Sequence, residues 1–509
     1  MSYKIVTNNY YISSFFWSTL AKVLNAIFGF ISVPLLLGYY GKADYGLLSI
    51  ATACNSYMHI MDLGMNTGAV RFFSQWKTQN KLDLINRVAR TNISFYLIIS
   101  IINVIGLLAL AFWGESFFSV THEQFLQLRL CLIILAIFSP ISWVASAFNQ
   151  LLIADKQISF TQQVSCLQMI LKLLLIVAVL KTNLALTTYF FYLTLILALA
   201  LLPYISRCLK KNLISSIWPA NYWRDFRVVL TFSLSIFALS LFQTTATQTR
   251  PIVLGIFAES GAEAVADYRI IEVIPQLIIM ICGTFLSIFL PKTTEIYTRG
   301  NHREISGFIK KWTSRTTALV CCLCFPFIVS ANEILSAYVG NGYSYLNKWL
   351  IVWCILLILQ LHSTPAYSML MAKGKTKMLV VYTAIASVIS VIVNALLCKS
   401  IPVGSAVIGY ATYMVSLVVL YYLLFYKRYL NISRRMVAIE FIKPFLLAIS
   451  ICVFPYLLGV RKEQFVDIFQ NERISYIISF IINALLWLVP YIAALFLTKI
   501  LTLKTFNHE

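Results

Sequence analysis

The sequence predicts an all-helical protein that crosses a membrane many times. Of its 509 residues, 60% are hydrophobic and only 12% are charged, which lies outside the range of soluble globular domains. The mean hydropathy is +0.81. Apolar windows of about 20 residues, enough for a helix to cross a bilayer, recur along nearly the whole chain. They leave no room for a separate soluble domain.

About fourteen of these windows are long enough to be membrane helices. The first reaches full spanning length without a small-residue cleavage pattern, so we expect a permanent helix and no cleaved signal peptide. In chain order, the expected spans are 14–37, 45–70, 91–113, 125–152, 158–180, 184–206, 228–257, 268–291, 313–338, 349–372, 378–398, 404–426, 439–459 and 474–497.

A long basic connection at 207–227 divides the chain after the sixth expected helix. Two six-helix bundles of the same orientation would then form parallel repeats. The prediction is a MATE-like pair of lobes, 1–210 and 211–430, followed by two additional helices in 431–509. The segments Pro34-Leu-Leu-Leu-Gly38 and Pro251-Ile-Val-Leu-Gly255 echo each other, although chance explains a match this short equally well.

The net charge of +21 is distributed by topology. If alternate connections lie on one side, 28 of the 40 Lys and Arg residues fall on the side of the N-terminus, eight on the other, and four within or at the edges of spans. This bias predicts that both termini and the basic connections face the cytoplasm. We therefore expect a multi-pass membrane protein with cytoplasmic termini, and no nucleic-acid partner.

No motif in the chain indicates catalysis. The eleven cysteines lie almost wholly in or beside spans and lack metal-ligand spacing, so we interpret them as small packing residues. The sequence contains no phosphate-binding glycine loop with lysine, zinc-protease motif or nucleophile elbow. We expect no catalytic residues, no metal, no cofactor and no enzymatic activity.

Three cations lie deep in otherwise apolar spans: Lys22, Lys172 and Arg250. Each costs about 2.5–3.5 kcal/mol at the centre of a membrane helix on insertion scales. Such residues usually face a hydrated cavity or an anionic partner. We therefore predict that these cations line a cavity between the lobes and bind an anionic, amphiphilic substrate.

Polar residues recur at steps of three and four residues along several expected spans, so that each set lies on one helical face. Asn25, Gln168 and Gln243 share faces with Lys22, Lys172 and Arg250. Asn55, His59, Asp62 and Asn66 share one face of the second span, and Gln276 shares a face with Glu272. They can line the cavity or hydrogen-bond neighbouring helices, and both interpretations stay open. His59 is individually more typical of a structural histidine. The predicted cavity residues are Asn25, Asn55, His59, Asn66, Gln168, Gln243 and Gln276.

Two carboxylates, Asp62 and Glu272, also lie deep in expected spans. We expect neither to have a cation one helical turn away, since Arg269 is placed near the outer interface. Substrate phosphate would compete for a cavity cation and release a carboxylate to take up H⁺ or Na⁺. The alternative, a fixed ion pair such as Asp62 with Lys22, is equally compatible with the sequence.

The second expected helix contains Asp62-Leu-Gly-Met-Asn-Thr-Gly-Ala-Val-Arg71, after Tyr45-Gly46 and a turn between Gly38 and Gly41. This segment resembles the N-terminal signature of the Wzx-type polysaccharide biosynthesis flippases. Their superfamily also contains lipid II flippases and multidrug exporters. The expected helix count, chain length and topology fit over nearly the whole chain.

The resemblance implies two lobes around a cationic cavity, in a protein of the bacterial inner membrane. It also implies the translocation of undecaprenyl-pyrophosphate-linked oligosaccharide to the periplasmic leaflet, for O-antigen, capsule or exopolysaccharide assembly. A polysaccharide polymerase and a chain-length regulator are further implied partners. Asp62 and Arg71 match the acidic and basic positions of the motif, and Arg71 joins the predicted substrate-binding cations. Lys22, Lys172 and Arg250 match no aligned motif and rest on their positions in the spans.

Two other functions stay open. A multidrug or cation antiporter of the same superfamily would need a surplus of acidic residues in its cavity, whereas here the surplus is basic. A membrane polymerase or ligase would need a catalytic surface, but the expected outward loops are short. The sequence does not identify the sugar unit.

Overall fold

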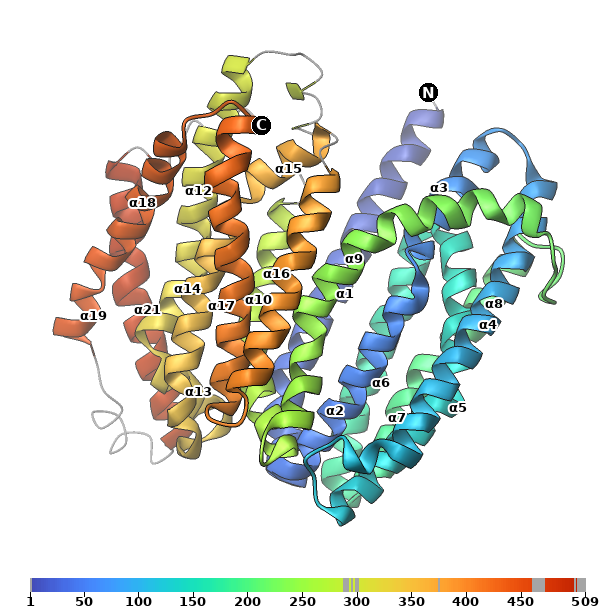
Figure 1. Ribbon diagram of the computed structural model, residues 1–509, viewed down its shortest axis with the longest axis horizontal. Helices are drawn as coiled ribbons and strands as arrows, with labels where there is room; N and C mark the ends of the chain where they lie inside the picture. Colours follow the sequence, from blue (N-terminus) through green and yellow to red (C-terminus); the bar gives the residue numbers. More distant parts are fainter. Residues whose placement is uncertain are drawn as a thin grey trace. The chain divides into compact units, whose positions relative to one another are not determined.

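All secondary structure in the described part of the chain is helical. The computed structural model describes residues 2–286, 302–373, 376–459 and 472–498, together with 293, 296, 297 and 500. These residues form α-helices and short 3₁₀ or π segments, and they contain no β-strand (Figure 1). The predicted all-helical class is confirmed.

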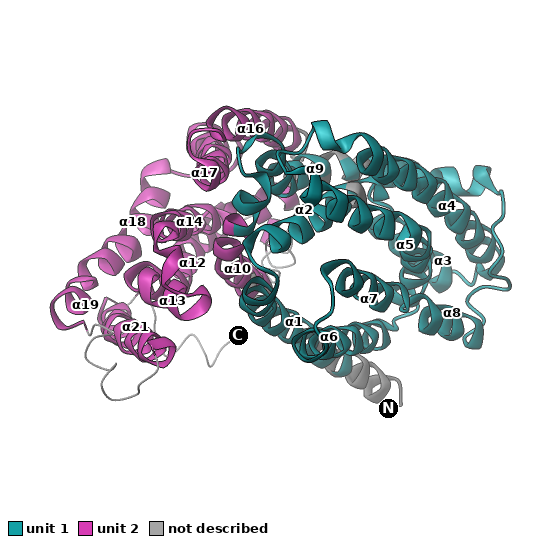
Figure 2. Cartoon of the chain, turned by 90° about the horizontal axis from the view of Figure 1, so that it is seen from below, with its two compact units in different colours: residues 1–266 teal, residues 267–509 magenta. Residues whose placement is uncertain are grey.

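The chain forms two compact units, which Figure 2 colours separately. Unit 1 covers Met1–Ala266. Its elements are α1 (Ser2–Tyr40), α2 (Lys42–Met58), η1 (His59–Asp62), α3 (Met65–Thr78), α4 (Leu82–Trp113), η2 (Gly114–Ser116), α5 (His122–Ala154), α6 (Ile158–Thr182), α7 (Leu186–Ala198), α8 (Leu201–Lys210), α9 (Trp223–Phe257) and the first turns of α10 (Gly261–Leu286).

Unit 2 covers Asp267–Glu509. After the remainder of α10, its elements are α12 (His302–Val329), α13 (Ala331–Val339), η3 (Asn341–Leu346), α14 (Asn347–Leu361), α15 (Thr364–Ala372), α16 (Thr376–Leu397), α17 (Pro402–Leu420), the π-helical η4 (Tyr421–Tyr429), α18 (Arg434–Ile451), α19 (Val453–Leu458) and α21 (Glu472–Leu497).

Local sequence signals explain where several helices begin. Thr121 and Gln124 form a capping box at the start of α5: the Thr121 hydroxyl accepts the Gln124 N–H at 3.3 Å, and the Gln124 side chain accepts the Thr121 N–H at 3.0 Å. Ser433 accepts the Met436 N–H at the start of α18. Each cap satisfies backbone donors that the first helical turn leaves unpaired.

Helix α9 packs with the N-terminal helices. In unit 1, α4 packs on α5 and α1 on α6, while α9 contacts α2, α3 and α4. The contacts between residues therefore divide the chain after Ala266. The basic connection at 207–227 had predicted a boundary at 210. The functional division into lobes 1–210 and 211–430, with 431–509 as an addition, stays a prediction.

The expected second helix is broken. α2 ends at Met58, a 3₁₀ turn follows, and Leu63 and Gly64 adopt left-handed φ values of 52° and 73° before α3 begins. Gly64 takes such a φ at little cost, because it has no Cβ. The prediction that Asn55, Asp62 and Asn66 share one continuous helical face is wrong, because periodicity does not reveal a break in the backbone.

The described residues contain 11 helices that are long and apolar enough to cross a membrane, so the expected count of fourteen is not confirmed. Of the expected spans that are absent, 45–70 is broken as above. Several side chains of 228–257 fall outside the described residues. The last span, 268–291, continues beyond the described residues.

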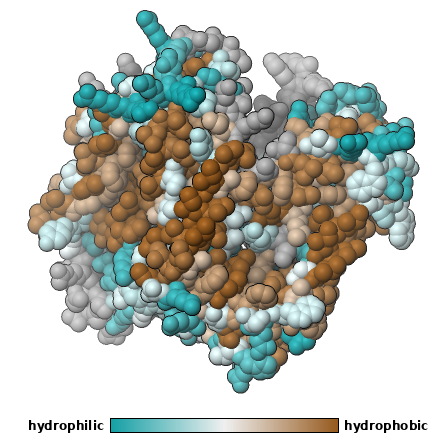
Figure 3. All heavy atoms as spheres, in the orientation of Figure 1, coloured by the Kyte–Doolittle hydropathy of each residue, from teal (hydrophilic) through white to brown (hydrophobic). Residues whose placement is uncertain are grey.

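Both units expose large apolar side chains, as a membrane protein requires. Ile137 is 63% exposed in unit 1, and Leu396 is 75% exposed in unit 2. In each unit, hydrophobic side chains cover much of the face in view, and hydrophilic side chains gather toward its ends (Figure 3). Contiguous apolar surface of this kind is stable against lipid and unstable in water. The chain is a multi-pass membrane protein.

Candidate functional site

Asp62 lies where α2 gives way to α3, and hydrogen bonds from protein groups hold its carboxylate. One oxygen accepts the backbone N–H of Asn66 at 3.0 Å, and the other accepts the Tyr96 hydroxyl. The first bond satisfies a donor in the opening turn of α3. Within the described residues, no ion pair joins Asp62 to Lys22, so this structure does not contain the fixed pair considered above.

A buried chain of hydrogen bonds continues from Tyr96. Gln150 of α5 donates its amide N–H to the Tyr96 hydroxyl at 2.5 Å, and Asn92 of α4 donates to the Gln150 carbonyl oxygen at 2.8 Å. Asn92, Tyr96 and Gln150 are completely buried. Breaking such a chain leaves buried polar atoms unsatisfied, which is costly in a low-dielectric interior. We call Asp62, Asn92, Tyr96 and Gln150 the carboxylate network.

The two glycines of the motif let α3 approach α9. A Cβ on Gly64 would lie 2.6 Å from the Ser233 carbonyl oxygen, and one on Gly68 would collide with the Ser233 hydroxyl. Arg71 places its guanidinium over the Phe232 ring, 4.2 Å from the centroid. This part of the motif therefore joins α3 to α9, and Arg71 is exposed at that junction.

Unit 1 contains a cavity of about 240 Å³ between α2, α5, α6 and α7. Figure 2 shows these four helices nearly end-on. Polar side chains enter it from every one of these helices, beside the aromatic rings of Phe138 and Trp143. They are Asn55 of α2, Ser139 and Ser142 of α5, Gln168 of α6 and Thr194 of α7. The lining contains amides and hydroxyls but no charged side chain.

Two of the predicted cavity residues, Asn55 and Gln168, meet in this unit 1 cavity. The amide of Gln168 also donates to the Ile196 and Leu197 carbonyl oxygens at 3.1 Å each. Ser139 donates to Asn103 of α4 at 2.7 Å. Hydrogen bonds to neighbouring groups therefore fix part of the lining. Asn66 and Asn25 are exposed and do not line this cavity. Predictions for the side chains of His59 and Gln243 fall outside the described residues.

The predicted cations occupy different environments. Lys172 is only 8% exposed, and its ammonium lies 5.5 Å from the centre of the Phe28 ring of α1. Lys22 is exposed. Arg250 is 5% exposed and donates to the Ala246 carbonyl oxygen at 2.8 Å, one turn earlier in α9. Lys172 and Arg250 are therefore the buried members of the set.

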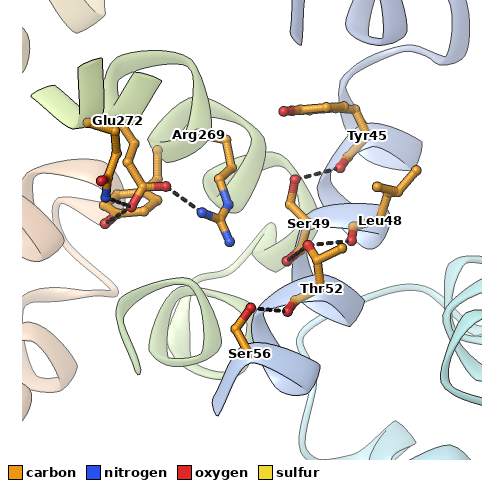
Figure 4. A network of polar contacts seen from close by, with 9 residues as sticks. Tyr45, Leu48, Ser49, Thr52, Ser56, Arg269 and Glu272 are labelled. Carbon is orange, nitrogen blue, oxygen red and sulfur yellow. Dashed lines mark hydrogen bonds and ion pairs between the residues drawn. The ribbon is translucent and has the colours of Figure 1, made fainter. Parts of the chain in front are cut away.

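Glu272 of α10, in unit 2, is paired. Its carboxylate forms an ion pair with Arg269 and accepts the Tyr268 hydroxyl at 3.0 Å and the Gln276 amide at 3.5 Å (Figure 4). The expectation that Glu272 has no cationic partner one helical turn away is wrong. Since the two residues are three apart on one helix, their side chains meet on the same face.

A separate row of hydroxyls runs along α2. Ser49 donates to the Tyr45 carbonyl oxygen, Thr52 to that of Leu48, and Ser56 to that of Thr52, at 2.9–3.0 Å (Figure 4). These bonds stay within the helix and satisfy hydroxyls that would otherwise need water. Polar spacing along a helix therefore does not by itself identify a ligand-binding face.

Sequence reasoning missed Asn92, Tyr96 and Gln150. Asn92 and Gln150 are polar residues inside expected spans, a signal that could have marked them. Their link to Asp62 could not be read from spacing, because 34 residues separate Asp62 from Tyr96 and 54 separate Tyr96 from Gln150.

Residues 12–296, more than half of the chain, match the family described as "Polysaccharide biosynthesis protein". A protein of Bacillus subtilis (strain 168), described as "Uncharacterized membrane protein EpsK", is 20% identical in an alignment 378 residues long, which covers 71% of this chain and 72% of that protein. The family match contains the motif, the carboxylate network and the unit 1 cavity.

Two solved structures share the fold. The first, "Lipid II flippase MurJ, inward closed conformation", has a TM-score of 0.65 at 12% identity, covering 95% of this chain and 99% of that one. The second, an inward-facing "multidrug resistance MATE family transporter of the MOP superfamily", has a TM-score of 0.63 at 14% identity, covering 78% and 92%. The resemblance stated from the motif is confirmed, and the chain belongs to the polysaccharide biosynthesis protein family.

Proposed function

We propose that this protein is a flippase that moves an undecaprenyl-pyrophosphate-linked oligosaccharide across the bacterial inner membrane. The family match over residues 12–296 carries the proposal. The fold shared with a lipid II flippase supports it. On this proposal the protein has no enzymatic activity. It works with a polysaccharide polymerase and a chain-length regulator in the assembly of O-antigen, capsule or exopolysaccharide.

The chemistry of the unit 1 cavity supports a glycan as part of the substrate. Amides and hydroxyls such as Asn55, Gln168 and Thr194 both donate and accept hydrogen bonds, as sugar hydroxyls do. Phe138 and Trp143 offer apolar rings beside them. A site of this kind binds a polar neutral group and provides no counter-charge for a drug cation. We infer that sugar units contact this cavity during translocation.

The buried cations supply the other half of the substrate's chemistry. Lys172 and Arg250 would bind the pyrophosphate by charge-assisted hydrogen bonds, with Lys22 and Arg71 at exposed positions. Both of these buried cations belong to unit 1. The coupling ion, H⁺ or Na⁺, would bind at Asp62. Glu272 becomes a weaker candidate for coupling, because Arg269 is its partner.

Reconstitution tests the proposal directly. The purified protein is placed in proteoliposomes with a fluorescent undecaprenyl-pyrophosphate oligosaccharide, and a membrane-impermeant quencher reports how much reaches the opposite leaflet. We expect movement above that of protein-free vesicles. If the lipid-linked glycan does not move while ethidium is exported, the protein is a cation antiporter and the proposal fails.

The proposed orientation can be tested separately. With both termini in the cytoplasm, Asn212 lies on the cytoplasmic side and Gly261 on the periplasmic side. Reporter fusions at these positions should be active in opposite compartments. The same compartment at both positions would contradict the topology that the charge bias predicts.

A further inference from the structure

A larger cavity, of about 770 Å³, lies in unit 2 where α12 packs against α18. It lies within the usual range of ligand pockets, about 300–1,000 Å³. It shares no lining residue with the unit 1 cavity. Its charged side chains are Lys310, Lys311 and Arg315 of α12 and Glu440 and Lys443 of α18. We call this the basic cavity.

The basic cavity holds more positive than negative charge. Four cations face one carboxylate, that of Glu440. The Glu440 carboxylate lies 3.9 Å from the Lys310 ammonium and 3.8 Å from the Lys443 ammonium. Cations therefore outnumber carboxylates four to one among the residues of this lining. An anion entering the cavity gains from this surplus.

Helical spacing places the cations of α12 on one face. Lys311 and Arg315 are one turn apart, and both lie beside the Trp312 ring, at 5.8 and 5.6 Å from its centroid. Cation–π contacts of this length restrict the long side chains near the cavity. The ammonium and guanidinium donors would therefore converge on a common anionic group, and Ser314 adds a hydroxyl.

The lining changes from charged to apolar along α18. One turn beyond Lys443, Leu446 and Leu447 also line the cavity. Leu446 is 57% exposed, and Ile442 and Ile449 on the same helix are 43% and 45% exposed. The cations are thus followed directly by apolar surface of the kind that faces lipid chains. This order suits a ligand with an anionic head and a hydrocarbon tail.

We propose that the basic cavity binds the phosphate headgroup of an anionic phospholipid, whose acyl chains lie along the exposed apolar face of α18. Basic pockets between membrane helices bind such headgroups on the cytoplasmic side. The charge bias predicts that the beginnings of α12 and α18 face that side. The proposal is independent of what the protein translocates.

The test measures lipid binding to the purified full-length protein by native mass spectrometry. Titrations use phosphatidylglycerol, with zwitterionic phosphatidylcholine as the comparison lipid. The double variant Lys310→Gln/Lys443→Gln should weaken phosphatidylglycerol binding about thirtyfold, because each Lys near an anionic lipid surface contributes about a fivefold change. The difference between the two lipids should shrink as salt rises.

Two further variants separate the site from general charge and from misfolding. The matched control Lys210→Gln/Arg224→Gln removes two exposed cations from the same predicted side of the membrane and should leave binding unchanged. Glu440→Gln removes the negative charge of the basic cavity and should strengthen binding severalfold. Damage to the fold does not produce such a gain. Equal losses in both double variants, or no gain in Glu440→Gln, would overturn the proposal.

Competition distinguishes the sources of the phosphate. Inorganic phosphate has no acyl chain and should displace phosphatidylglycerol only at millimolar concentrations. Displacement by micromolar inorganic phosphate would indicate a site for soluble anions and refute a lipid site. Undecaprenyl pyrophosphate could instead displace bound phosphatidylglycerol at a concentration tenfold below the one at which phosphatidylglycerol itself binds. That result would assign the basic cavity to a polyprenyl carrier, which also contradicts the proposal.

Discussion

The carboxylate network makes the most specific prediction about stability. Tyr96→Phe removes one hydroxyl, which donates to the Asp62 carboxylate and accepts from Gln150. Tyr96 is completely buried, so water does not easily replace either bond. Hydrogen bonds to charged groups contribute about 1.5–3 kcal/mol. Within membrane proteins, bonds between helices average about 0.6 kcal/mol.

The range of about 1.5–3 kcal/mol applies to the bond between Tyr96 and Asp62, because the acceptor is a carboxylate. The substitution also leaves the Gln150 amide without its Tyr96 acceptor. We therefore expect Tyr96→Phe to lower the free energy of unfolding by about 2 kcal/mol. The assay is reversible unfolding in mixed micelles, followed by tryptophan fluorescence. Tyr189→Phe is the matched control, since Tyr189 is 1% exposed and makes no hydrogen bond within the described residues.

A double-mutant cycle separates the network from simple loss of volume. Gln150→Leu removes the bonds to Tyr96 and to Asn92. Because Tyr96→Phe and Gln150→Leu break the same bond, their combination should cost at least about 1 kcal/mol less than the sum of the single changes. Additivity within about 0.3 kcal/mol, or an equal loss in Tyr189→Phe, would refute the network as a source of stability.

Three other predictions follow from single contacts. Gly68→Ala should destabilise the protein by about 1–3 kcal/mol, because the added Cβ would collide with Ser233. In a thermal unfolding assay, adding Ser233→Gly should restore most of the lost stability, and a loss that is not restored would contradict the contact. Arg269→Gln should reduce the yield of folded protein, because it leaves the buried Glu272 carboxylate without its cation. Adding Glu272→Gln should restore the yield, and equal yields from all variants would contradict this pairing. Lys172→Ala should abolish translocation in proteoliposomes while Lys172→Arg keeps part of it, since the charge survives; full activity of the alanine variant would exclude Lys172 from the proposed pyrophosphate site.

The sequence alone predicted the fold class and the family. Both depend on short-range information: the hydropathy of a window of about 20 residues decides whether a helix is stable in lipid, and no tertiary contact easily overrides it. The segment from Asp62 to Arg71 likewise carries its resemblance within ten residues. The division at 210 used the same kind of information and did not anticipate that α9 packs on α2, α3 and α4.

Tertiary structure decided the partners of the polar residues. Asp62, Tyr96 and Gln150 meet because three helices pack side by side, and helical periodicity says which face a residue shares but not what that face contacts. At the turn of Leu63 and Gly64, the backbone of Gly64 lies so close to α9 that a Cβ would be 2.6 Å from the Ser233 carbonyl oxygen. Lys310 reaches Glu440 for the same reason, because α12 packs on α18. Such contacts join residues far apart in the chain, so only the packed helices determine them.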